Sequence, residues 1–492
     1  MALHSECAMC PVYLPDRQWW RDACGVFGIQ ARGMGDLSRM CYFGLFALQH
    51  RGQESAGMAL GDGRDLKHHT GMGLATQVFN DEIIARLTGN VALGHVRYST
   101  MGSNVIQNAQ PMVGEHRSGP FALAHNGNLL NAVELREELR AKGIEVAGTS
   151  DSAVLTAWIA QCDRPTIEEA LMEAMHRVSG AYSLGVVTPT HLIGVRDPQG
   201  VRPLSIGRLN DSGWIVTSET CALHVVGAKY VREVEPGEIV SFRDDELEAT
   251  QVMDPERKAS CIFEFIYFAR PDSHIYGRSI YQSRVRMGHM LATQAPVEAD
   301  MVMGIPETGI PHAIGYAEVS RIPFGEGFIK NRYIHRTFIA PSQRMRSLGV
   351  RMKLTPLREA IDGKRLVVVD DSIVRGTTTG PEIALLREAG AREIHVRISC
   401  PPIKFPCFYG VDTSAGRSEL IAARLSKEDI RKHIGADSLD FLNLRNLVKA
   451  VGLPKHNFCT ACFDNDYPIP VPEDLLVSKF DLEEEPAPVV SP

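Results

Sequence analysis

The sequence predicts two successive domains: an α+β half built in layers, followed by an α/β half built on a parallel sheet. Its 492 residues exceed what one ordinary hydrophobic core accommodates. Up to about residue 255, β-rich runs come in pairs separated by pairs of helical patterns, which is typical of helices packed around antiparallel sheets. Beyond that point strands and helices alternate singly, as they do in a parallel sheet.

The individual elements are short and end at turn residues. In the first half we expect strands over 24–29, 91–96, 121–124 and 182–187, and helices over 37–49, 132–142 and 152–160. A polar stretch over 242–260 is interpreted as the seam between the halves. In the second half we expect strands over 301–304, 365–369 and 393–399, and helices over 312–319 and 382–389.

Composition narrows the class of protein. No apolar run approaches the roughly 18–20 residues of a membrane span, and the first 23 residues lack the apolar core of a secretory signal, so we expect a cytoplasmic protein that does not bind membranes. A net charge of −7 argues against nucleic acid as a partner. Eleven cysteines then indicate a catalytic thiol, a metal site or burial rather than disulfides. Four of them lie in apolar surroundings and are expected to pack in the core: Cys41, Cys162, Cys221 and Cys400.

The most specific motif runs from Leu366 to Thr378. A branched apolar run ends in Asp370 and Asp371, and a hydroxyl-rich turn with one glycine leads into a helical pattern. In this arrangement the acids can reach a sugar diol, while backbone N–H groups and hydroxyls can bind a phosphate at the helix N-terminus. An ordinary strand-to-helix turn would not need paired acids followed by Gly-Thr-Thr. The motif resembles the phosphoribosyl-pyrophosphate loop of type I phosphoribosyltransferases.

Five segments of the first half complete a second resemblance. They are Cys24-Gly25-Val26-Phe27-Gly28-Ile29, the stretch 49–57 around His50-Arg51-Gly52, Gly94-His95-Val96-Arg97-Tyr98-Ser99-Thr100, His125-Asn126-Gly127-Asn128, and Thr149-Ser150-Asp151-Ser152. Together they resemble the N-terminal-nucleophile glutaminase domain of class II amidotransferases, a four-layer αββα fold. With the diphosphate loop, the chain from Cys24 to about Pro468 is similar to the glutamine phosphoribosylpyrophosphate amidotransferases, in their iron–sulfur-containing, propeptide-processed branch.

The resemblance implies a division of the chain. Residues 1–23 would be a propeptide, 24–255 the glutaminase domain and 256–470 a type I phosphoribosyltransferase domain with a parallel sheet and the iron–sulfur site. Residues 471–492 would form a tail whose acidic, proline-containing end is expected to be flexible.

In the glutaminase half the resemblance assigns a role to each polar residue. Cys24 would be the nucleophile, with its own α-amino group as the base, so residues 1–23 must be removed. Asn126 and Gly127 would form the oxyanion hole. Arg97 would bind the glutamine carboxylate and Asp151 its ammonium, although a surface ion pair is the alternative for these two. His95 and His125 are expected to pack or to support a loop.

In the other half, Asp370 and Asp371 would bind the ribose hydroxyls and Mg²⁺. The 5-phosphate would lie in the turn formed by Ser372, Val374, Arg375, Gly376, Thr377 and Thr378. The stretch 303–309 matches the family's pyrophosphate loop, and Thr308 stands where the family often has a magnesium-associated serine. The basic segment from Lys330 to Lys353 is interpreted as a loop that closes over pyrophosphate and completes an ammonia tunnel, with a solvated basic face or an RNA patch as alternatives.

Cys459-Thr-Ala-Cys462 has the spacing with which two thiolates bind one metal or cluster. From spacing alone, structural zinc is a strong alternative. The resemblance implies a [4Fe–4S] cluster, with Cys261 and Cys407 as the other two ligands. Cys7 and Cys10 form a second, poorer pair in the leader, and two ligands alone make a weak site.

The implied activity is the first step of purine synthesis: glutamine, water and phosphoribosyl pyrophosphate give 5-phosphoribosylamine, glutamate and pyrophosphate. A glutamine–fructose-6-phosphate transaminase shares the glutaminase half but has no need of the diphosphate loop. A catalytically silent regulatory paralogue that binds nucleotide or phosphoribosyl pyrophosphate would be signalled by loss of Cys24 or of both aspartates, and all three are present. The resemblance further implies inhibition by purine nucleotides and a homotetramer.

Overall fold

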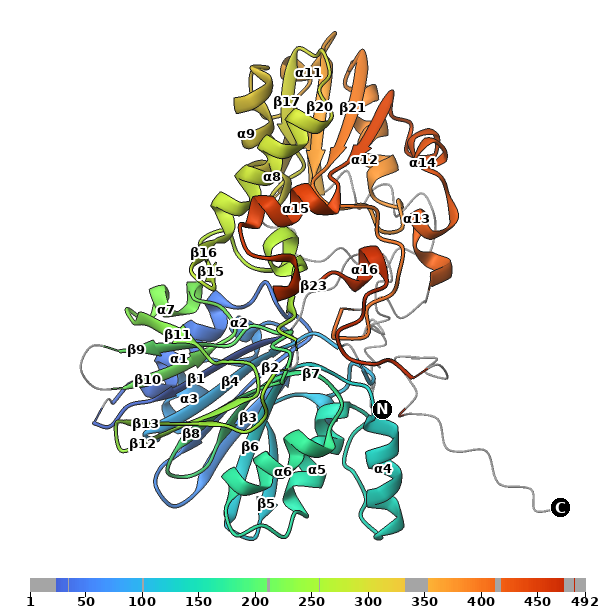
Figure 1. Ribbon diagram of the computed structural model, residues 1–492. Coiled ribbons are helices and arrows are strands. Elements are labelled where there is room, and N and C mark those ends of the chain that lie inside the picture. The colour runs from blue at the N-terminus through green and yellow to red at the C-terminus, as the bar shows by residue number, and fades with distance from the viewer. Residues whose placement is uncertain are drawn as a thin grey trace, which may run out of the picture.

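Two antiparallel sheets form the centre of the first half (Figure 1). The computed structural model describes residues 24–33, 35–99, 101–209, 213–255, 257–331, 353–411, 417–472 and 482. The seven-stranded sheet has the order β11 (Lys229–Glu233), β9 (Ser205–Arg208), β10 (Trp214–Thr217), β1 (Gly25–Gln30), β4 (Val91–Arg97), β2 (Ser55–Gly61) and β3 (Leu66–Met72). The six-stranded sheet has the order β13 (Glu246–Gln251), β12 (Glu238–Arg243), β8 (Leu192–Arg196), β7 (Gly180–Val187), β6 (Gly119–Leu129) and β5 (Met112–His116).

The sheets face each other across one apolar layer that includes Val26, Leu93, Ala122 and Val240. Helices cover the outer face of the seven-stranded sheet: α1 (Leu37–Ala47), α2 (Ala75–Val78), α3 (Asp81–Arg86) and α7 (Cys221–Val225). The outer face of the six-stranded sheet packs on α4 (Ala132–Ala141), α5 (Asp151–Ala160) and α6 (Ile167–Arg177). Since both faces of each sheet are covered, β1, β4 and β7 are buried at every residue. The predicted four-layer αββα fold is confirmed.

The second half contains a four-stranded parallel sheet in the order β17 (Met301–Gly304), β20 (Arg365–Asp370), β21 (Glu393–Ile398) and β22 (Ser438–Phe441). Around it lie α8 (Ile280–Gln294), α9 (Gly309–Ser320), α11 (Arg358–Ile361), α12 (Thr379–Glu388), α13 (Ile421–Arg424), α14 (Lys427–Ile434) and α15 (Leu444–Val451). This confirms the predicted α/β half. Because β17 and β20 are parallel neighbours, the loops that follow them leave the sheet at the same edge.

Short elements join the halves. A π-helix, η2, spans Glu264–Phe268, and β14 (Ser260–Cys261) pairs in parallel with β23 (Phe458–Cys459), just before α16 (Ala461–Asp464). The remaining small pairs are β15 (His274–Ile275) with β16 (Arg278–Ser279), and β18 (Phe328–Lys330) with β19 (Leu354–Pro356). The interpretation of 242–260 as a seam is wrong for its first part, because 246–251 is the edge strand β13, whose residues are mostly exposed and therefore polar.

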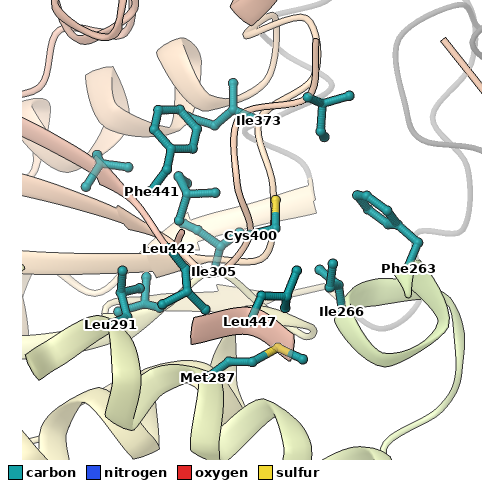
Figure 2. Packing of buried hydrophobic residues seen from close by; sticks show 14 of the residues in the cluster. Phe263, Ile266, Met287, Leu291, Ile305, Ile373, Cys400, Phe441, Leu442 and Leu447 are labelled. Atoms are coloured by element: carbon teal, nitrogen blue, oxygen red, sulfur yellow. The ribbon is translucent and has the colours of Figure 1, made fainter. Parts of the chain in front are cut away.

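Packing accounts for the cysteines expected in the core. Cys41, Cys221 and Cys400 are fully buried, and Cys162 is 9% exposed, which confirms that prediction. Figure 2 shows Cys400 among apolar side chains such as Ile305, Leu442 and Leu447. The leader 1–23, the basic segment 332–352 and most of the tail lie outside the described residues. Within the described part of the chain, none of the helices has the length and apolar character needed to cross a membrane.

Candidate active sites

Cys24 lies immediately before β1 and is buried against Tyr98. Its Sγ accepts a hydrogen bond from the Tyr98 amide at 3.3 Å and donates to the Tyr98 carbonyl at 3.2 Å. Burial raises the pKa of the Cys24 thiol to about 12, and the neighbouring guanidinium of Arg97 offsets only part of this. The thiol is therefore protonated at neutral pH and needs a base to react.

The thiol opens into a small hollow of about 10 Å³ at the ends of β4 and β6. Its lining is Cys24, Arg97, Tyr98, Met101, Gln110, His125, Gly127, Ser150, Asp151 and Ser152. Asn126 is fully buried beside it, and neither its amide nitrogen nor its amide oxygen has a hydrogen-bond partner among the described residues. An unpartnered buried amide is costly unless a ligand uses it, so Asn126 is available to bind a substrate oxygen.

Gly127 occupies a position where only glycine fits. Its φ is +151°, and a Cβ there would lie 2.0 Å from the carbonyl oxygen of Ala181 on β7. On its other side it faces Gly410 of the second half, whose own Cβ would lie 3.0 Å from the Gly127 carbonyl carbon. The backbone of Gly127 is thus in contact with both halves of the chain.

Arg97 and Asp151 approach the hollow from different elements. Arg97, at the end of β4, donates to the carbonyls of Met101 at 3.1 Å and Ser103 at 3.3 Å. Asp151, in the first turn of α5, accepts from the amides of Leu129 at 3.0 Å and Ser152 at 2.8 Å. Both residues are buried, so the alternative of a surface ion pair is wrong.

The two histidines next to the hollow have supporting contacts. His95 Nε2 donates to the carbonyl of His125 at 3.1 Å, and burial lowers the pKa of His95 to about 3, so the ring stays neutral. His125 Nδ1 lies 3.1 Å from the Ser152 hydroxyl. Burial lowers the pKa of His125 as well.

A larger cavity, about 200 Å³, lies at the carboxyl edge of β17 and β20. Every residue that the sequence assigned to the sugar diphosphate lines it, namely Thr308, Lys330, Asp370, Asp371, Ser372, Val374, Arg375, Gly376, Thr377 and Thr378. Lys330 Nζ lies 3.5 Å from a Glu307 carboxylate oxygen, and Arg375 Nε lies 2.8 Å from Glu419.

The paired acids at the end of β20 are held by their own loop. The Asp371 amide donates to Asp370 Oδ1 at 2.9 Å, and the Ser372 hydroxyl donates to Asp371 Oδ2 at 2.6 Å. Burial raises the pKa of both carboxyls. The buried Arg284 guanidinium opposes this shift at Asp371. A divalent cation at this place would favour the ionised acids that its binding requires.

Two residues of this cavity, Tyr267 and Glu382, were not predicted from the sequence, whereas Glu307 and Lys353 belong to the predicted pyrophosphate loop and basic segment. Glu382 is 3% exposed on α12, and burial raises its pKa to about 8, against the attraction of Lys353. Glu382 could have been proposed from the sequence, because it is an acid in the first turn of the helix that follows the predicted phosphate loop.

A buried ionic network behind the thiol was also missed. Arg51 Nε donates to the Cys24 carbonyl at 3.1 Å, and its Nη2 donates to Glu264 of the π-helix at 2.8 Å. Arg51 also pairs with Glu219. Arg284 binds the same π-helix through the carbonyls of Phe265, Tyr267 and Ala269 at 2.7–3.0 Å. The π-helix therefore connects the surroundings of Cys24 with those of Asp371.

Two of the four cysteines assigned to a cluster are paired near the junction of the halves. Cys261 and Cys459 are register partners in the β14–β23 pair, and Cys462 follows in α16. Burial and then the thiols of Cys459, Cys261 and Cys407 raise the pKa of Cys462, so the four are within electrostatic reach of one another. Among the described residues, no three His, Cys, Asp or Glu side chains converge closely enough to hold a single ion.

Comparison with known proteins gives consistent matches. A family model described as a glutamine amidotransferase domain matches residues 95–225. The chain is 50% identical over 474 residues to the amidophosphoribosyltransferase of Synechococcus elongatus, covering 95% of both chains. It is 46% identical to that of Bacillus subtilis, covering 93% of this chain and 96% of the relative.

Solved structures agree in fold over nearly the whole chain. One, described as the allosteric regulatory enzyme of purine biosynthesis, superposes with a TM-score of 0.86 at 46% identity and covers 92% of this chain and 97% of its own. Another, the glutamine phosphoribosylpyrophosphate amidotransferase of B. subtilis complexed with ADP and GMP, has a TM-score of 0.86 at 45% identity and covers 92% of this chain and 98% of its own. The chain therefore belongs to the amidophosphoribosyltransferase family, the enzymes of the first step of purine biosynthesis.

Proposed function

We propose that this chain makes 5-phosphoribosylamine at two sites, one that hydrolyses glutamine at Cys24 and one that transfers the released ammonia to phosphoribosyl pyrophosphate. The observation that supports this best is the cavity at the carboxyl edge of β17 and β20, because every residue assigned to the sugar diphosphate lines it. The same chain holds a buried thiol beside an unpartnered amide, which suits amide hydrolysis.

At the first site, Arg97 would bind the glutamine carboxylate and Asp151 the ammonium, which orients the side-chain amide toward Cys24. The Cys24 sulfur attacks the amide carbon, and Asn126 with the Gly127 N–H stabilises the oxygen anion that forms. Ammonia leaves, and water then releases glutamate from the thioester. Because burial keeps the thiol protonated, a base close to Cys24 must take its proton.

At the second site, Ser372 to Thr378 would hold the 5-phosphate, and the two aspartates the ribose hydroxyls. Ammonia attacks C1 of the sugar while pyrophosphate leaves toward Lys330 and Thr308. The donors here are carboxylate and hydroxyl oxygens, which fit Mg²⁺, and such an ion would neutralise charge on the departing pyrophosphate.

The proposed base is the α-amino group of Cys24, so cleavage after Ala23 should accompany activity. We expect the active protein, purified without air, to begin at Cys24 by N-terminal sequencing. It should release pyrophosphate when given glutamine and phosphoribosyl pyrophosphate together. No pyrophosphate release would contradict the proposed function, whereas activity in a protein that retains Ala23 would contradict only the proposed base.

We further propose that Cys261, Cys407, Cys459 and Cys462 hold a structural [4Fe–4S] cluster. The donors fit, since the four thiols come from three segments near the junction of the halves. Burial raises the pKa of Cys261 and Cys459, and the positive charge of Arg202 opposes this shift. A bound cluster would take the thiols as thiolates and tie the three segments together.

Metal analysis tests the cluster directly. We expect about four iron atoms and four sulfides per chain in protein purified without air, and a brown colour. Cys462→Ala should lose the iron, because it removes a ligand. Cys400→Ala is the matched control: its thiol is buried nearby but donates to the Pro401 carbonyl, so the iron should remain. Zinc in place of iron would contradict the assignment.

The remaining parts of the proposal come from the family. Binding of purine nucleotides is proposed because the B. subtilis relative was solved with ADP and GMP. A homotetramer in the cytoplasm is proposed from the resemblance, as is the division of the chain at residues 23, 255 and 470.

A further inference from the structure

Three residues of the second half, Phe408–Gly410, contact β6 at Gly127 and Asn128. We call these three residues the clasp. The Phe408 carbonyl accepts a hydrogen bond from Asn128 Nδ2 at 3.2 Å, one residue after Gly127. The Gly410 backbone, at φ +99°, approaches Gly127 so closely that a Cβ on Gly410 would lie 3.0 Å from the Gly127 carbonyl carbon and 3.1 Å from its oxygen. A side chain at position 410 would therefore be strained by its positive φ and crowded against Gly127.

Arg202 fixes the clasp from the glutaminase half. Its Nε and Nη2 both donate to the Tyr409 carbonyl, at 2.9 and 2.7 Å, and its Nη1 lies 3.5 Å from Glu264 Oε1. The side chain is fully buried. A guanidinium with two donors on one carbonyl sets the position of that carbonyl closely. Arg202 does not line the hollow around Cys24.

The clasp is also anchored on its far side. The Tyr409 hydroxyl donates to the Ile469 carbonyl at 2.6 Å and accepts from the Ile469 amide at 3.2 Å. Its amide donates to the Cys407 sulfur at 3.4 Å. Tyr409 is 1% exposed, so these bonds are made in a dry environment. Hydrogen bonds therefore hold the clasp from two sides, from Arg202 and from Ile469, while Gly410 contacts the backbone of Gly127.

We propose that Arg202 and Gly410 are positioning residues for glutamine hydrolysis: through the clasp they hold the Gly127 N–H where the oxygen anion forms. This inference rests on the oxyanion role proposed for Gly127. Oxyanion stabilisation depends on donors that are fixed before the reaction, and a displacement of about 1 Å can cost about 10²-fold in rate. None of the clasp residues lines the hollow or the sugar diphosphate cavity, and Gly410 reaches the hollow only through Gly127. Its effect should therefore appear in turnover of glutamine and not in the transfer step.

The test is Gly410→Ala, compared with Gly452→Ala. Both glycines have positive φ, but a Cβ on Gly452 meets nothing within 4 Å, so the control carries the backbone strain without the contact. We expect Gly410→Ala to lower kcat for glutamine by about tenfold or more, with KM for glutamine changed less than about threefold, because Arg97 and Asp151 are untouched. Pyrophosphate release driven by free ammonia should match that of Gly452→Ala within about twofold.

Arg202→Lys is the second variant. If Gly410→Ala does not fold, Arg202→Lys still tests whether the clasp positions Gly127 for glutamine hydrolysis. It keeps the charge toward Glu264 but loses the paired donors, so the same selective fall in kcat is expected, smaller than for Gly410→Ala. If glutamine-driven and ammonia-driven rates fall together, or if neither changes relative to Gly452→Ala, the clasp is only packing and the inference is overturned. Absence of glutamine-driven activity in the unaltered protein would instead refute the proposed function.

Discussion

Replacement of Cys24 by alanine is expected to abolish glutamine-driven pyrophosphate release and to leave synthesis from free ammonia intact. Cys24 is the one cysteine that lines the hollow among the described residues, and removal of a catalytic nucleophile typically costs at least ~10³-fold in turnover. Free ammonia bypasses this site and reacts in the cavity beside β20. The measurement is the rate of pyrophosphate release with each nitrogen source at saturating phosphoribosyl pyrophosphate.

Cys41→Ala is the matched control for this experiment. Cys41 is another fully buried thiol of the same half, packed on β1 through its contact with the Phe27 carbonyl, and it lies outside the hollow. Both variants remove one sulfur atom from a packed interior, so general destabilisation should be similar. Retention of glutamine use by Cys24→Ala would exclude this thiol as the nucleophile. Equal loss of both nitrogen sources would show that the variant is misfolded and not selectively impaired.

Asp371→Asn is expected to abolish both routes, by about 10²-fold or more, because it acts on the transfer step that they share. The substitution keeps the shape of the side chain but removes the negative charge that would bind Mg²⁺ and accept from the ribose hydroxyl. It also leaves the buried Arg284 without the charge that faces it. Pyrophosphate release is measured with glutamine and with ammonia, and folding is checked by thermal unfolding.

A control for Asp371→Asn lies on the opposite edge of the same sheet. Asp300 precedes β17, is paired with Arg365 at 2.8 Å and lies outside the cavity. Asp300→Asn should therefore leave both rates unchanged. If Asp371→Asn lost only glutamine-driven pyrophosphate release, Asp371 would act in the transfer of ammonia between the sites. Its assignment to the sugar diphosphate would then be wrong.

The loop between β20 and α12 could be predicted from the sequence, because its features come from residues that are consecutive in the chain. Asp370 ends a strand and Thr378 precedes a helix, so the diphosphate loop could be recognised from hydrophobicity and turn residues alone. Gly127 and Asp151 were assigned only through the resemblance to a known family, because the contact that requires glycine at 127 is made with Ala181, which is distant in the chain.

Contacts between the halves could not be predicted in this way. Arg51 and Glu264 are separated by more than two hundred residues, and nothing in either neighbourhood identifies the other as a partner. The clasp contributes backbone carbonyls at Phe408 and Tyr409, and every residue has a carbonyl. The error over 242–260 has a similar origin. An edge strand with an exposed face is polar, so β13 looks like a linker until its partner β12 is known.

Arg51 and Arg202 of the first half both pair with Glu264 of the second half, so the two halves cannot be exchanged with those of another protein without regard to this contact. A chimaera that joins this glutaminase half to a transferase half with no acid at the position of Glu264 would leave the buried Arg202 without a carboxylate partner and Arg51 with Glu219 alone. An uncompensated buried charge costs about 3–5 kcal/mol, a large share of the stability of a typical domain. We therefore expect such a chimaera to be less stable than the natural chain unless its transferase half supplies an acid at this position.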